Sequence, residues 1–133
     1  FIALKKGNVI PIVLPGASLG LGLPFAPARA LLDHGLPLVI ASDWNPGSAP
    51  MGRLLTAAAL MGAAEHLSMA ETLAAITVRA AAALECTDRG LLTAEKNADF
   101  LLFETDDFRD ILYHQGSLLP TTVFIKGISY VCN

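Results

Sequence analysis

One stretch decides the fold: LVIASDWNPGSAP, which spans residues 38–50. The residues up to Ser42 are almost continuously apolar, as is typical of a parallel strand that is covered on both faces. Asp43 follows directly, and after it comes a turn-rich segment with two prolines and a glycine. The pattern predicts a buried strand over residues 36–42 and a stiff loop that begins at Asp43.

A second strand and a helix precede this stretch. Residues 9–14, VIPIVL, are rich in β-branched residues and predict another buried strand. Residues 17–26 are expected to form a packed loop. Residues 27–35 are expected to form a short helix, because a proline stands at its start and a glycine follows its end. A strand, a helix and a strand in this order form a βαβ unit, so the sequence predicts an α/β fold with parallel strands.

The second half of the chain predicts two helices and then a small β region. The helices are expected over residues 51–66 and 69–84, and Ser68 and Glu71 have the spacing of a capping box. The β region is expected to hold a short strand within residues 88–97, a strand over 98–104, an irregular segment over 105–120, and a hairpin of 121–126 and 128–132 that turns at Gly127. We therefore expect residues 1–87 to form an α/β part and residues 88–133 a β part.

Composition excludes several classes of protein. The 133 residues are 53% hydrophobic and 16% charged, against a usual charged fraction of about 25%. The net charge of −3 and the scattered basic residues argue against a nucleic-acid partner. No apolar run approaches the roughly 18 residues that a membrane span needs, and two distant cysteines indicate a reducing compartment. Because a chain this apolar begins with Phe1, we expect it to be the C-terminal portion of a longer protein.

Asp43 is the residue whose position suggests chemistry. In parallel α/β sheets and barrels, ligands bind at the carboxyl ends of the strands. Asp43 is predicted to lie at such an end, and Asn45, Gly47 and Ser48 follow it with an amide, a bare backbone and a hydroxyl. A second interpretation stays open, in which Asp43 and Asn45 only form an Asx-type turn.

Several motifs together carry a resemblance. The specific one is ASDWNPGSAP at residues 41–50, and DRGLLTAEKNADFLLFE at residues 88–104 looks like a G-x-L-x-x-G-x-x-A-D signature in which Glu95 replaces the usual glycine. Further matches lie at residues 14–17, 69–84, 113–116 and 123–127. With these motifs the chain resembles the imidazolonepropionase family, within the metal-dependent amidohydrolase superfamily.

The resemblance implies a fold and an activity. The fold would be the C-terminal part of a (β/α)8 TIM-like barrel plus part of a small β-sandwich domain. The activity would be hydrolysis of the ring amide of 4-imidazolone-5-propanoate to N-formimidoyl-L-glutamate, a cytoplasmic step of histidine degradation. Asp43 would be a ligand of one zinc or iron ion, and the general base that takes a proton from the metal-bound water. Asn45, Gly47 and Ser48 would bind the small-molecule substrate.

The family's other metal ligands are histidines on earlier barrel strands, and no H-x-H motif occurs in this sequence. We interpret His34 and His66 as helix-end residues, because a cation is favoured at a helix C-terminus. His114, in an expected loop, is left open between a structural role and one near the substrate. A complete barrel takes about 250 residues. The missing N-terminal barrel segment is therefore the expected partner, the piece alone is expected to be inactive, and a homodimer is left open.

Two other interpretations of the function compete with this one. In the first, the parent protein is an amidohydrolase that acts on another cyclic amide or imine. In the second, the piece is a non-catalytic binding module. An H-x-H motif on an apolar strand upstream of Phe1, together with a further histidine before the seventh barrel strand, would indicate the enzyme. The role of Trp44 is also open, because its ring either stacks on a ligand or fills space beneath the loop.

Overall fold

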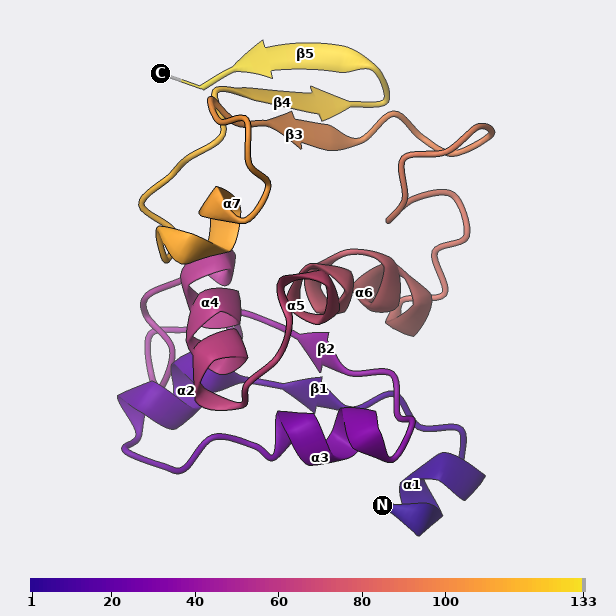
Figure 1. The fold of residues 1–133 in the computed structure, drawn as a ribbon, viewed down its shortest axis with the longest axis vertical. Coiled ribbons are helices and arrows are strands. Elements are labelled where there is room, and N and C mark those ends of the chain that lie inside the picture. The colour runs from indigo at the N-terminus through magenta and orange to yellow at the C-terminus, as the bar shows by residue number, and fades with distance from the viewer. Residues whose placement is uncertain (133) are drawn as a thin grey trace.

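Two separate sheets organise residues 1–132, the part of the chain that the computed structural model describes. The first sheet pairs β1 (Ile12–Val13) with β2 (Val39–Ile40) in parallel. The second is antiparallel and runs in the order β3 (Phe100–Leu102), β4 (Thr122–Ile125) and β5 (Ile128–Val131). The first sheet lies toward the N-terminal end of the molecule and the second at the C-terminal end (Figure 1).

Helices lie on both sides of the parallel pair. On one side is α3 (Ala28–Asp33), and on the other are α4 (Leu54–Ala64), α5 (Met69–Ile76) and α6 (Val78–Ala83) (Figure 1). This arrangement explains the apolar strand, since Leu38 and Ile40 of the β2 segment are 0% and 2% exposed. The remaining helices are short: α1 (Ile2–Lys6), α2 (Pro15–Gly20) and α7 (Asp110–Tyr113). No helix among residues 1–132 is both long enough and apolar enough to cross a membrane.

The core lies where β2 meets the helices on its two sides. Leu31 of α3, Ile40 of β2 and Met61 of α4 are buried there together, and Leu112 of α7 joins the same cluster. Small side chains let the helices approach closely. A Cβ added at Gly62 of α4, for example, would lie 3.0 Å from the Oγ1 of Thr72 of α5.

Several sequence predictions are confirmed. A helix occupies the expected 27–35 region, and Gly35 after its end has a φ of +71°. Ser68 and Glu71 form the predicted capping box, with each side chain bonded to the other residue's backbone N–H. The C-terminal hairpin turns at Lys126 and Gly127, whose φ values are +50° and +79°. Two positive φ values in succession are typical of a tight hairpin turn.

The single helix expected over residues 69–84 is wrong. The chain forms α5 and α6 instead, and Thr77 between them has φ −125° and ψ −95°. Its Oγ1 donates a hydrogen bond of 2.7 Å to the carbonyl of Leu73. Three consecutive β-branched residues, Ile76 to Val78, disfavour the helix, and the threonine hydroxyl competes for a carbonyl in the helical ladder.

Three other expectations are wrong in part. The first residues of the expected loop 17–26 belong to α2, because the proline that ends the strand also begins a helix. Residues 88–97, all of which are described, contain no strand, since the Asn97 N–H donates to the Asp88 carbonyl at 2.7 Å and closes a loop there. The irregular segment 105–120 contains α7.

Candidate active site

Asp43 lies just beyond the carboxyl end of β2, as the sequence predicts. The strand's last ladder bond joins the Ala41 N–H to the Val13 carbonyl at 3.1 Å, and Asp43 follows two residues later. Asp43 is exposed, and its φ is +49°. Few residues other than glycine adopt this left-handed conformation, although aspartate and asparagine do so more readily than most. The chain therefore turns sharply at the residue on which the candidate chemistry depends.

Asn45 organises the loop that follows, which we call the 43–52 loop. Its Oδ1 accepts hydrogen bonds from the backbone N–H groups of Gly47, at 2.9 Å, and Ser48, at 2.8 Å. Its Nδ2 donates to the Asp43 carbonyl at 2.6 Å and to the Ser48 Oγ at 3.2 Å. An Asx-type turn is therefore present, and Asn45 is the residue that forms it. The amide of Asn45 is directed into the loop.

The carboxylate of Asp43 is left largely free. Within residues 1–132 its one hydrogen-bonding contact is with the Asn45 Nδ2, at 3.3 Å, and it forms no ion pair. An ionised carboxylate can accept about four hydrogen bonds. Most of its capacity therefore remains for a cation, a water molecule or a substrate proton.

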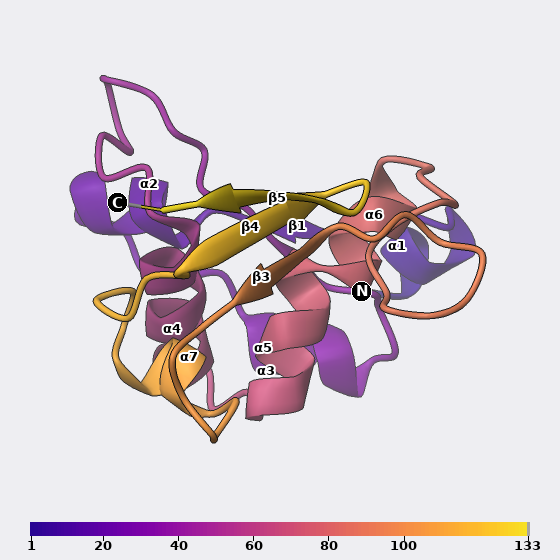
Figure 2. The same cartoon turned by 90° about the horizontal axis from the view of Figure 1, so that it is seen from above.

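The 43–52 loop packs against α2. Figure 2 shows that the loop protrudes from the rest of the molecule beside that helix. A Cβ added at Gly20 would collide with the carbonyl oxygen of Ser48, and one added at Gly16 would lie 3.3 Å from the Ser42 carbonyl oxygen. Glycine at these positions lets the helix backbone touch the loop backbone. Sequence reasoning assigned Gly20 to a loop and missed this contact, which no local pattern signals.

Trp44 does not fill space beneath the loop, so that interpretation is wrong. The residue is 77% exposed. The pyrrole half of the indole lies against Gly52, because a Cβ added there would be 2.9 Å from Cδ1 and 3.0 Å from Cγ and Nε1. Gly52 also has a φ of +62°, which a side chain would disfavour. Two features of Gly52 therefore support the present position of the ring.

The three histidines all lie at or just after helix C-termini. His34 follows α3, and its Nδ1 is 2.7 Å from the Ala30 carbonyl oxygen; His66 follows α4 with φ +53°. Both placements are as predicted. His114 follows α7, with its ring edge-on to Tyr113 at a centroid distance of 5.3 Å. Among the described residues, no three His, Cys, Asp or Glu side chains come together in a group that could hold a metal ion.

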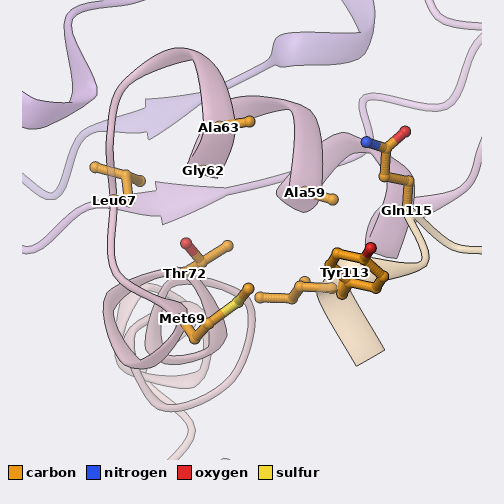
Figure 3. Close-up of a pocket in the computed structure, with 9 residues that line it drawn as sticks. Ala59, Gly62, Ala63, Leu67, Met69, Thr72, Tyr113 and Gln115 are labelled. Atoms are coloured by element: carbon orange, nitrogen blue, oxygen red, sulfur yellow. The ribbon is translucent and has the colours of Figure 1, made fainter. Parts of the chain in front are cut away.

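Two cavities in the described part of the chain lie outside this loop. The smaller, of about 260 Å³, is bounded by α4, α5 and α7, with Met69, Thr72 and Tyr113 on its walls (Figure 3). The larger, of about 510 Å³, is mainly apolar and lies between α5, α6 and β3. Neither is lined by Asp43 or by the three residues predicted to bind substrate. The 43–52 loop at the end of β2 is therefore separate from both of these cavities.

Comparison with known proteins gives these features a context. The sequence profile of the amidohydrolase family matches residues 13–112. An imidazolonepropionase from Deinococcus radiodurans is 42% identical over 125 residues, which are 94% of this chain and 31% of that protein. The alignment covers so much of the chain that it includes the 43–52 loop. This chain spans about a third of the length of the curated relatives that it matches.

Solved structures show the same fold. The crystal structure of an adenosine deaminase from Xanthomonas campestris with bound zinc matches with a TM-score of 0.74 and 26% identity, over 96% of this chain and 33% of that one. The crystal structure of a triazine hydrolase variant matches with a TM-score of 0.80 and 23% identity, over 95% of this chain and 32% of that one. The mixed α/β arrangement seen here is therefore shared with part of these enzymes.

Proposed function

This chain belongs to the amidohydrolase family, and from that premise we propose that it is the C-terminal part of a metal-dependent hydrolase that opens the ring amide of 4-imidazolone-5-propanoate. The product would be N-formimidoyl-L-glutamate, in histidine degradation. One observation carries the proposal: the alignment with an imidazolonepropionase, at 42% identity overall, covers 94% of this chain and so includes the loop that presents Asp43. The exposed, nearly unpartnered carboxylate at a strand end supports the same conclusion.

We propose that residues 1–87 are the last two strands and closing helices of a (β/α)8 barrel, and residues 88–133 the C-terminal part of a small β-sandwich. The two separate sheets support this division, and exposed apolar side chains on both of them support the incompleteness of each part. Ile12 of β1 is 54% exposed, and Ile128 and Val131 of β5 are 61% and 76% exposed. Covering such residues with further strands would recover the free energy of their burial. The part of the parent protein N-terminal to Phe1 would supply those strands.

The proposed reaction uses one zinc or iron ion, and Asp43 is chemically suited to bind it. Carboxylate oxygens are ordinary ligands of zinc, and the Asp43 carboxylate is exposed with a single amide contact among residues 1–132. Because the described residues offer no three-ligand group, the remaining ligands would come from the N-terminal segment. When bound, such a metal supplies Lewis-acid activation of a water molecule.

The residues of this chain would then move the proton and hold the substrate. Asp43 takes a proton from the attacking water and delivers it to the ring nitrogen that leaves when the amide C–N bond breaks. Asn45 fixes the turn through its 2.6 Å bond to the Asp43 carbonyl, and so orients the carboxylate. Together with Gly47 and Ser48 it forms the substrate-binding loop, in which the bare backbone of Gly47 permits close approach.

We also propose a cytoplasmic location, which the free thiols of Cys86 and Cys132 support. A homodimer is the oligomeric state to test, by light scattering of the full-length protein.

The test uses the full-length protein and its Asp43→Ala variant. Turnover is followed by the loss of imidazolone absorbance and by mass spectrometry of the product, and metal content by elemental analysis. We expect the variant to lose at least roughly a thousandfold in kcat, together with bound metal. The matched control is Asp106→Asn, since Asp106 is exposed and its side chain makes no hydrogen bond to the described residues.

Two results would contradict the proposal. Near-normal turnover by Asp43→Ala would remove Asp43 from the mechanism. Failure of the wild-type protein to open 4-imidazolone-5-propanoate, with turnover of another cyclic amide or a ring imine instead, would show that the substrate is wrong. An adenosine deaminase is among the structural relatives, so adenosine belongs in that substrate panel.

A further inference from the structure

Trp44 occupies a position that the catalytic scheme does not explain. It follows Asp43 directly in the chain and is the only tryptophan among the 133 residues. A large apolar side chain normally contributes most when it is buried, yet this one is 77% exposed. Exposure alone does not single out Trp44, because Ile12 is exposed as well. Its place directly after the candidate catalytic carboxylate is what distinguishes it.

One face of the indole lies against the protein backbone. Gly52 lies under Cγ, Cδ1 and Nε1, so close that a Cβ at this position would be within 2.9–3.0 Å of these atoms. Since Gly52 has a φ of +62°, its backbone conformation also favours glycine. The contact of the ring is therefore with backbone, and only glycine at position 52 leaves room for it.

The rest of the indole is open. No aromatic ring among the described residues pairs with Trp44. Arg53, the one cationic residue near it in the sequence, is engaged elsewhere, because its Nη1 donates to the Gly116 carbonyl at 3.4 Å. A planar group with one supported face and one free face is suited to stack on another planar ring.

We propose that Trp44 is a substrate-contact residue, and that its open face stacks on the planar five-membered ring of the cyclic amide while Asp43 acts at the ring amide. This assignment rests on the proposed function for the identity of the ring. Stacking acts on the substrate before and during the reaction alike, so its loss raises KM and leaves kcat nearly unchanged. Trp44 thereby selects flat cyclic substrates over open-chain amides.

The first experiment compares two variants of the full-length enzyme. Trp44→Phe keeps a flat ring and is expected to hold KM within about threefold of the wild type, whereas Trp44→Leu, which is apolar but not flat, is expected to raise KM roughly tenfold with kcat within about twofold. A retained kcat shows that the Leu variant is folded. An unchanged KM in Trp44→Leu, or an equal increase in both variants, overturns the proposal.

The second experiment needs no turnover. The full-length protein is labelled with 5-fluorotryptophan, and the fluorine resonance that is missing from Trp44→Phe is assigned to Trp44. Titration with imidazole-4-propanoate, a planar ring with the same side chain and no hydrolysable amide, is expected to move this resonance in a saturable way. Glutarate, which has no ring, is expected to leave it in place. A Trp44 resonance that does not move with imidazole-4-propanoate overturns the proposal.

The two experiments separate this inference from the proposed function. If the wild-type protein does not turn over 4-imidazolone-5-propanoate but the Trp44 resonance moves, the aromatic contact stands and the substrate assignment falls. If turnover is normal but Trp44→Leu keeps its KM, the proposed function stands and Trp44 has no part in binding.

Discussion

Arg29 and Glu71 form a bidentate ion pair that joins α3 to α5. The Arg29 Nη1 lies 3.0 Å from the Glu71 Oε2, and its Nη2 lies 3.0 Å from the Oε1. Glu71 also accepts a 2.8 Å hydrogen bond from the Ser68 backbone N–H as part of the capping box. One carboxylate therefore ties the start of a helix to a neighbouring helix.

This pair predicts a decrease in stability in acid. The hydrogen bond from Arg29, followed by that from the Ser68 backbone, lowers the pKa of Glu71 from 4.5 to about 2. Because folding favours the ionised form, the contribution of Glu71 to the free energy of unfolding is complete above pH 4.5 and is lost as the pH falls through about 2. We expect Glu71→Gln to make the loss of stability over this range shallower.

Urea unfolding of the full-length protein at a series of pH values measures this effect. The control is Glu104→Gln, because Glu104 is exposed and makes no hydrogen bond or ion pair within residues 1–132. Its pH profile should follow that of the wild type. A Glu71→Gln profile with the wild-type slope would show that the ion pair does not act on stability.

Ser68→Ala is expected to destabilise α5. The Ser68 Oγ accepts a 3.2 Å hydrogen bond from the Glu71 backbone N–H, which would otherwise be unsatisfied at the helix start. Loss of such a cap lowers the free energy of unfolding by about 1 kcal/mol. Ser68→Thr keeps the hydroxyl and should recover most of that loss in the same unfolding measurement. Equal effects of the two substitutions would exclude capping as the cause.

The contrast between these two features shows what could be predicted from the sequence. The capping box depends on residues three apart, so its pattern is visible in the chain itself. The Arg29–Glu71 pair joins residues 42 positions apart, and no local pattern signals it. The break at Thr77 is only partly visible in the sequence. The β-branched run Ile76 to Val78 disfavours a helix, but the alanine-rich residues around it favour a continuous one.

In the candidate site, too, some features can be predicted from the sequence and others cannot. The strand end at Asp43 was predictable, because an apolar run followed by turn residues reports burial and chain reversal. The Asx-type turn was one of two interpretations, and only the hydrogen bonds to Gly47 and Ser48 place it at Asn45. Glu95, where the signature has glycine, has a φ of +67°. The backbone conformation that glycine favours is therefore kept although the residue differs.

Asn45→Ala is expected to lower kcat and raise KM together, with a loss of roughly tenfold or more in kcat/KM. The substitution removes the acceptor for the Gly47 and Ser48 N–H groups and the donor to the Asp43 carbonyl. The turn that orients the carboxylate would then loosen. Asn45→Asp keeps the acceptor oxygen and should recover part of the loss. Steady-state kinetics of the full-length enzyme measure the effect.

Amide hydrogen exchange separates this role of Asn45 from direct substrate binding. In Asn45→Ala the Gly47 and Ser48 amides should exchange faster than in the wild type, because their acceptor is gone. A variant whose KM rises while kcat and these exchange rates stay at wild-type values would identify Asn45 as a substrate contact instead.

Gly20→Ala, a substitution in α2, is expected to displace the 43–52 loop that packs against this helix. The added Cβ would collide with the carbonyl oxygen of Ser48, which is backbone and cannot move without the loop. Overpacking of this kind costs about 1–3 kcal/mol of stability, and a misplacement of about 1 Å at a catalytic group can lower the rate by roughly a hundredfold. We therefore expect a decrease in kcat/KM of ten- to a hundredfold.

The matched control for Gly20→Ala is Gly7→Ala. Gly7 follows α1 with a φ of −81°, and a Cβ there would have its nearest neighbours at 3.4 Å, which is ordinary contact. Gly7→Ala should therefore keep both its melting temperature and its kcat/KM. Retention of metal by Gly20→Ala, measured by elemental analysis, would show that Asp43 still coordinates and that only its orientation has changed. Wild-type kcat/KM in Gly20→Ala would mean that the contact between Gly20 and Ser48 does not set the position of the loop.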